Sequence, residues 1–129
     1  MTTENAKNFI EDIKNEKIPV GEMNTGKDEF FFSVGLLEGY FVCHFNDTMT
    51  NKEIFHHCRN IGSVCDFFFQ RYKANNHRLM VDCHWQKQLV AIISEGKERF
   101  GKDTPLDSKD EENFTMGHAL AIGYPDLFK

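Results

Sequence analysis

The stretch EFFFSVGLLEGYFVCHFN, residues 29–46, decides which fold class the sequence predicts. Its Phe- and Val-rich composition suits the pleated, largely buried surface of a β-strand. Residues 29–37 are therefore predicted to form one strand and residues 40–46 a second. Glu38 and Gly39 between them are candidates for a tight turn, which would make the two strands antiparallel.

Downstream of this stretch, residues 50–73 have the clearest helical pattern in the chain. Apolar residues recur there at alternating spacings of three and four: Ile54, Cys58, Ile61, Cys65, Phe68 and Tyr72. Such spacing places them along one face of an amphipathic helix. Glu53 follows Thr50 by three residues, as in a capping box. Asn75 and Asn76 tolerate left-handed backbone, so the helix is expected to end near them.

The flanking segments complete the pattern: a short N-terminal helix at 4–16 and strands at 79–85 and 114–123. Thr2 or Thr3 is the expected cap of the first helix. Residues 88–100 are either a fourth strand or a helix, because periodicity cannot separate the two in a short apolar run. Residues 101–113 are predicted to be an acidic loop.

Together these elements predict one domain, residues 1–129, of the α+β class. It would be a two-layer sandwich: an antiparallel sheet of four to five strands, the long amphipathic helix on one face, and the short N-terminal helix. The length of 129 residues fits one domain, and an apolar content of 40% is enough for one core.

Charge and hydropathy narrow the function classes. The net charge of −5 argues against duplex nucleic acid as a partner, since such binders gain affinity by neutralising phosphates. The sequence has no apolar run near the roughly 18 residues that a membrane span requires. The opening residues, MTTENAKNFIEDIKNEK, contain no apolar signal core. We therefore expect a cytoplasmic protein that does not enter the membrane.

The four cysteines, Cys43, Cys58, Cys65 and Cys83, are expected to be reduced. Cys43 and Cys83 would point from their strands toward the helix that carries Cys58 and Cys65, and all four would be core thiols. A zinc-stabilised domain built on them is an alternative. Because no CxxC, HxxxH or HExxH spacing is present, no metal and no cofactor are expected.

Three residues of the opposite sheet face form a candidate acid–base constellation. His44, Asp82 and His84 would point away from the helix, and a carboxylate beside an imidazole is a common way to orient a catalytic histidine. Cross-strand surface pairing explains the same residues without catalysis. A small hydrolase-type enzyme using them is therefore an alternative to a non-catalytic protein.

The densest basic stretch lies near the end of the long helix and contains Arg71, Lys73, His77 and Arg78. Arginine forks suit phosphate or carboxylate, so these four residues are the candidate ligand-binding site for a small anion. Cations at a helix C-terminus also complement the helix dipole and need no ligand.

The thirteen phenylalanines exceed what one helix stripe can bury. Phe67 is a candidate for an exposed or secondary contact. An apolar outer sheet face would be covered by a second copy of the chain in a homodimer; its residues would be Phe31, Val42, Met80 and Ile92.

The sequence as a whole favours a non-catalytic binding protein. It would recognise a protein partner or a small anionic, phosphate-bearing ligand, as an inhibitor, immunity or sequestering protein of microbial or viral origin does. Its acidic periphery would attract basic surfaces.

Overall fold

The computed structural model describes residues 2–15, 26–45, 51–82 and 86–123. Within the helices, the description leaves out these side chains: 43–45, 51, 52, 54, 72, 75–82 and 86–88. The described residues form six α-helices: α1 (Thr3–Lys14), α2 (Lys27–Phe45), α3 (Asn51–His57), α4 (Ile61–Asp82), α5 (Gln86–Phe100) and α6 (Ser108–Gly123). Over these ranges the β-structure is limited to an isolated antiparallel bridge between Asn60 and Pro105.

The predicted α+β sandwich with an antiparallel sheet is therefore wrong. Of the two strands predicted within residues 29–46, residues 29–45 belong to the single helix α2 and residue 46 lies outside the described residues. The strand predicted at 114–123 lies in α6. Of the strand predicted at 79–85, residues 79–82 continue α4 and the other three lie outside the described residues. For residues 88–100, where the sequence allowed either state, the structure has a helix, α5.

Helix α2 lacks a helical hydrophobic pattern because it is buried on every side. Side chains that leave it in all directions are at most 1% exposed: Phe30, Phe31, Phe32, Leu36, Leu37, Tyr40 and Phe41. A helix that is apolar all round belongs in the centre of a helical protein. The same composition reads as a buried strand when only one sequence is available, since both lack alternation.

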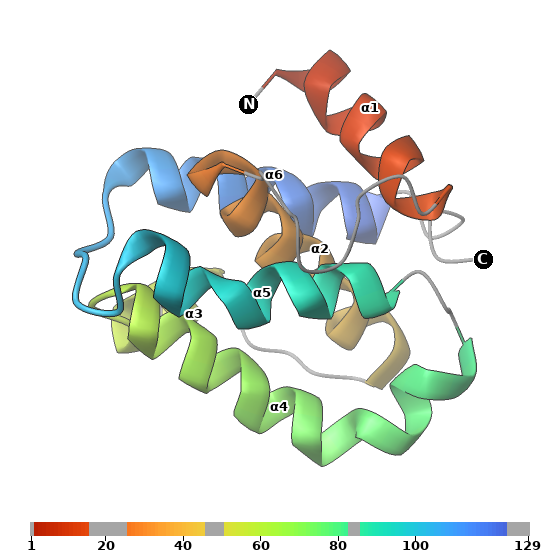
Figure 1. Ribbon diagram of the computed structural model, residues 1–129. Coiled ribbons are helices and arrows are strands. Elements are labelled where there is room, and N and C mark those ends of the chain that lie inside the picture. Colours follow the sequence, from red (N-terminus) through yellow and green to blue (C-terminus); the bar gives the residue numbers. More distant parts are fainter. Residues whose placement is uncertain (1, 16–25, 46–50, 83–85, 124–129) are drawn as a thin grey trace.

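The other helices surround α2. Helices α6 and α5 pack against it, α4 packs against α5, and α3 packs against α6. Figure 1 shows α5 between α6 and α4, with α2 passing behind it. Helix α1 lies across one end of this group, where its Phe9 ring contacts Phe32 of α2 edge-on at 5.9 Å between centroids. Among the described helices, none combines the length and apolarity needed to cross a bilayer.

Helices α2 and α6 approach each other closely through glycines. A methyl group built on Gly35 would overlap the carbonyl oxygen of Phe114, and one built on Gly117 would overlap the carbonyl oxygen of Phe32. Gly39 lies equally close to α6. These glycines remove the side chains that would keep the two backbones apart. Gly117, an interior glycine of the segment predicted as a strand at 114–123, thus allows the helix α6 to pack closely on α2.

The long helix predicted at residues 50–73 is two helices, α3 and α4, separated by Cys58–Asn60. Asn60 caps α4, because its Oδ1 accepts hydrogen bonds from the backbone N–H and the hydroxyl of Ser63, both at 2.8 Å. The expected end at Asn75 and Asn76 is also wrong, since α4 continues to Asp82.

The N-terminal helix and part of the acidic loop are closer to the prediction. Helix α1 agrees with the helix predicted at 4–16, and Thr2 caps it by accepting a hydrogen bond from the Asn5 N–H at 3.1 Å. The acidic loop predicted at 101–113 is shorter in the structure, because α6 begins at Ser108. Gly101, with φ at +84°, turns the chain away from α5, a conformation that glycine adopts without strain.

We predict that Gly35→Ala destabilises the protein by about 2–4 kcal/mol, because the added methyl group must push α6 away from α2. At an unobstructed helix position the same change would stabilise by up to about 1 kcal/mol. Gly123→Ala is the matched control, since a methyl group there meets nothing within 4 Å. Urea unfolding of both variants measures the difference, and equal stabilities would contradict the close contact.

Candidate functional site

A buried ion pair joins α2 to α4. The guanidinium Nη1 of Arg71 donates to the carboxylate Oε2 of Glu38. The Glu38 side chain is 1% exposed and that of Arg71 is 12% exposed. The guanidinium also lies over the rings of Phe41 and Phe67, 5.1 and 5.6 Å from their centroids. The charge of Arg71 is thus neutralised inside the protein.

His118 of α6 belongs to the same interior cluster. Its Nε2 is buried and has no hydrogen-bond partner among the described residues. Its ring stacks near that of Phe114, with the centroids 6.1 Å apart and the planes at 27°. Burial lowers the pKa of His118, and the positive charge of Arg71 lowers it further. The neutral imidazole is therefore the stable form next to the guanidinium.

Two thiols, Cys58 and Cys65, are buried and free. Burial raises the pKa of Cys58 from 9.0 to about 11, and the nearby Glu38 carboxylate adds to the shift. Burial likewise raises the pKa of Cys65 to about 11, and its Sγ donates to the carbonyl of Ile93 at 3.6 Å. These properties are those of core residues, whereas a reactive thiol has a depressed pKa.

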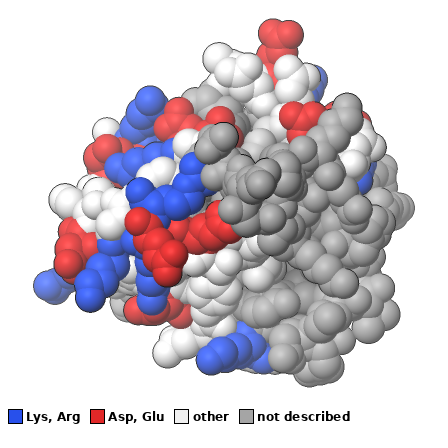
Figure 2. Space-filling view, viewed as in Figure 1, with Lys and Arg blue, Asp and Glu red and all other residues white. Residues whose placement is uncertain are grey.

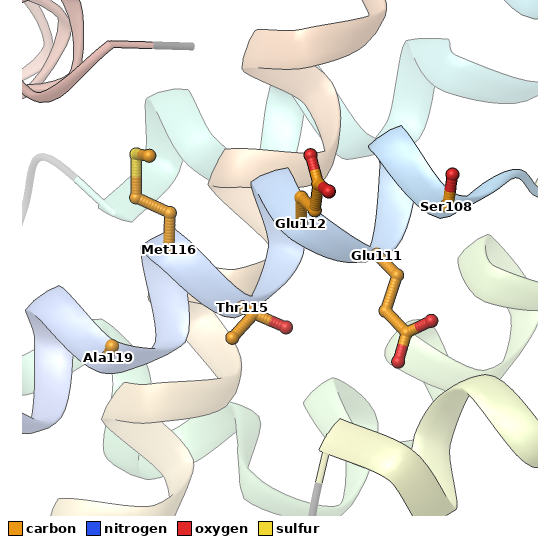
Figure 3. Close-up of a pocket in the computed structure, with 6 residues that line it drawn as sticks. All are labelled: Ser108, Glu111, Glu112, Thr115, Met116 and Ala119. Atoms are coloured by element: carbon orange, nitrogen blue, oxygen red, sulfur yellow. The ribbon is translucent and has the colours of Figure 1, made fainter.

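A shallow hollow of about 570 Å³ lies along the outer face of α6. The residues that line it follow one another by one or three positions along the helix: Ser108, Glu111, Glu112, Thr115, Met116 and Ala119. Figure 3 shows them on one side of α6, with the carboxylates of Glu111 and Glu112 pointing apart near its first turns and Met116 farther along. Acidic groups thus flank one end of the hollow, and small or apolar side chains form the rest.

The start of α6 is fixed by a reciprocal cap. The Asp110 N–H donates to Oδ1 of Asp107 at 2.9 Å, and the Asp107 N–H donates to Oδ2 of Asp110 at 3.1 Å. Lys27 of α2 lies 3.2 Å from Oδ2 of Asp110 and so ties the two helices together. The backbone hydrogen bond from Asp110 lowers the pKa of Asp107, whereas burial raises that of Asp110.

Charges elsewhere on the described surface are mixed. Figure 2 shows basic and acidic side chains interleaved on the side where α6 and α4 begin. Several form ion pairs, among them Lys97 with Asp66 and Lys109 with Asp28. Neither Glu111 nor Glu112 has an ion-pair partner among the described residues, and both are exposed. Their carboxylates are therefore available to an outside cation.

The residues predicted as an anion site are distributed along α4. The guanidinium of Arg71 faces Glu38 in the interior, whereas Lys73 is exposed. The side chains of His77 and Arg78 lie outside the described residues. The structure thus does not show these four groups converging, and the anion site stays a prediction.

The predicted acid–base constellation also stays a prediction. His44 and Asp82 lie in α2 and α4, but their side chains, like the whole of His84, are outside the described residues. Because His44 and Asp82 lie in helices, the shared sheet face on which this constellation was predicted is not found in the described residues. Of the proposed zinc ligands, the side chains of Cys43 and Cys83 are likewise not described. The part of the chain that the structure does describe holds no group of three His, Cys, Asp or Glu side chains suited to a metal ion.

The apolar sheet face proposed for a homodimer does not exist in the described residues. Phe31 is fully buried and Ile92 is 2% exposed, both within the helical core. Phe67 is half-buried and supports the Arg71 guanidinium, which makes it a secondary contact within the protein. Homodimerisation itself is untested and stays a prediction.

Glu38, His118 and the hollow on α6 are not predicted from the sequence. Glu38 was assigned to a turn, although a single carboxylate within the apolar stretch from residue 30 to 43 signals a buried partner if the stretch is helical. His118 and the lining residues Thr115, Met116 and Ala119 lie in or beside the segment predicted as a strand. Their grouping follows only from a helical repeat.

Comparison of the chain with models of known protein families, with curated proteins and with solved structures finds no match. Its function is therefore inferred from the chemistry of the described residues alone.

We predict that Glu38→Ala destabilises the protein by about 3 kcal/mol, because it leaves the Arg71 guanidinium in the interior without this carboxylate. Glu38→Leu combined with Arg71→Met should recover most of that loss, since an apolar pair needs no neutralisation. Urea unfolding of Glu38→Leu, of Arg71→Met and of the double variant measures the coupling energy between the two side chains. Additive single effects would contradict a direct buried pair.

We also predict that Cys58 and Cys65 resist alkylation by iodoacetamide in the native protein. A pKa of about 11 in place of 9.0 lowers the thiolate fraction at neutral pH by about 100-fold. Peptide mass spectrometry after timed labelling, with a urea-unfolded sample as control, measures each site. Labelling at the same rate in both samples would contradict their burial.

Proposed function

We propose that this protein is a non-catalytic binding protein that docks a basic amphipathic helix of a protein partner along the outer face of α6. The observation that carries the proposal is the hollow of about 570 Å³ on that face, with exposed carboxylates at one end. A helix laid into a shallow groove is a recurring mode of peptide recognition.

The dimensions of the hollow fit a short helical segment. Its lining runs from Ser108 to Ala119, which is about three turns, or roughly 16 Å, of α-helix. Met116 is half-buried, and Ala119 is small and exposed. An apolar side of a partner helix would cover them, and each apolar side chain removed from water would add favourable free energy.

The negative charge of the site favours a positively charged partner. Glu111 and Glu112 are exposed and lie in the first turns of α6. A partner with Lys or Arg facing these carboxylates would gain affinity and speed of association, whereas an acidic partner would be repelled. The whole chain carries a net charge of −5, which reinforces this preference.

The internal pairing of Arg71 weighs against the small anionic ligand that the sequence also suggested. A guanidinium held by Glu38 would have to leave a buried pair to bind phosphate, and this costs free energy. Of the two kinds of partner that the sequence suggested, the described geometry thus favours a protein over a small anionic ligand.

We predict that the protein binds a fluorescently labelled helical peptide of Leu and Lys, and that Glu111→Lys/Glu112→Lys weakens this binding by about tenfold or more at low salt. The loss follows from reversing both charges at the end of the hollow. Fluorescence anisotropy measures the Kd, and circular dichroism verifies that the variant is folded.

The control variant is Glu4→Lys/Glu11→Lys, which makes the same change in net charge at two exposed positions of α1. It should change the Kd by no more than about twofold, since screening weakens distant charges. A peptide of Leu and Glu should not bind. If the two double variants weaken binding equally, or if the wild-type protein does not distinguish the two peptides, the docking proposal is wrong.

A further inference from the structure

We propose that His118 is a pH-sensitive switch. Protonation of its imidazole would weaken the packing of α6 against α2. This inference stands apart from the docking proposal, because it concerns a contact inside the protein and its test needs no ligand.

The backbone of His118 lies next to two of the glycines at which α2 and α6 approach each other closely, Gly35 and Gly39. A methyl group on Gly35 would lie 2.9 Å from the His118 backbone nitrogen, and one on Gly39 would lie 2.9 Å from its carbonyl oxygen. The imidazole is half-buried, and its Nε2 is buried without a hydrogen-bond partner among the described residues. The imidazolium carries a proton on both ring nitrogens, so its Nε2–H would be a buried donor that has no acceptor among the described residues.

The charge environment makes this proton still less favourable. Burial lowers the pKa of His118 below its ordinary 6.5, and the Arg71 guanidinium lowers it further. If α6 moves away and the imidazole reaches water, its pKa returns toward 6.5 and a proton binds more readily. Above pH 6.5 the neutral imidazole therefore gives the packing of α6 on α2 its full stabilisation. This stabilisation is lost as the pH falls from 6.5 toward the lower pKa of the buried imidazole.

Other ionisable groups surround this contact. From α2 comes Glu38, from α4 comes Arg71, and Cys58 lies between α3 and α4 close enough to interact with Glu38. On α3, which also packs against α6, the described charged or titratable side chains are exposed: Glu53, His56 and His57. Protonation of Glu38 in acid would also weaken its pair with Arg71, so variants of His118 are needed to assign the effect.

Opening of α6 would have a specific consequence for the fold. Its inner face carries the buried residues Asn113, Phe114, Gly117 and Ala121, which cover α2. The Phe114 ring also contacts Phe55 of α3 edge-on, 4.9 Å between centroids. Loosening α6 would therefore expose apolar surface of both α2 and α3, whereas the contact between α4 and α5 does not involve α6.

The test is hydrogen–deuterium exchange of the full chain at pH 7.5 and pH 5.5, corrected for the pH dependence of intrinsic exchange. Amides of α6 should lose up to about tenfold in protection at the lower pH, and amides of α5 should lose less. His118→Asn has no imidazole to protonate, so the acid-induced loss in α6 should disappear. His57→Asn makes the same substitution at an exposed histidine and should keep the wild-type response.

A second measurement keeps the inference testable if His118→Asn does not fold. The titration of the His118 imidazole in the wild-type protein, followed by NMR, should give a pKa below 6.5. His118→Phe should then also exchange in a pH-independent way. The inference is overturned if the His118 imidazole titrates at or above 6.5, if protection of α6 is the same at both pH values, or if a folded His118 variant keeps the wild-type acid response.

Discussion

The structure depends on the close approach of the α2 and α6 backbones. Gly35 on α2 and Gly117 on α6 each lie directly against backbone atoms of the other helix, and Gly39 on α2 leaves room for the methyl group of Ala121 on α6. Because α2 is apolar on all sides, it must be covered by other helices on all sides. Helix α6 is the one that packs closely against its glycines. The remaining helices complete the enclosure of α2, with α5 on a second side of it.

The polar features follow from this contact. Seating α6 on α2 brings His118 into the interior, where Glu38 already pairs with Arg71 of α4. The same helix then presents its opposite side, with the exposed carboxylates of Glu111 and Glu112, to the surroundings. Helix α6 is thus held by the packing of its inner face, and its outer face is the surface that we propose for recognition.

How much the sequence predicts depends on the surroundings of each element. The one-sided apolar pattern of Phe9, Ile10 and Ile13 gave α1, and the stripe containing Cys65 and Phe68 gave the first part of α4, since both helices have a polar side. Helix α2 has none, so its Phe-rich stretch was indistinguishable from a buried strand.

The roles of the glycines and of the candidate site could not be predicted from the sequence for a related reason. Gly39 and Gly117 are unfavourable in an isolated helix, and only the pairing of α2 with α6 explains them. That pairing joins segments far apart in the chain, which local patterns do not report. Arg71 was recognised as notable, but its partner Glu38 depends on the same tertiary arrangement.

The most direct test of the central claim is the measurement of interhelical nuclear Overhauser effects from the α-protons of Gly35 and Gly39 in isotopically labelled protein. The structure predicts cross-peaks from these protons to α6, including the backbone amide of His118 and the methyl group of Ala121. Sequential helical cross-peaks should run through residues 30–45. Strand-type sequential cross-peaks there, or the absence of any contact between these glycines and α6, would contradict the account.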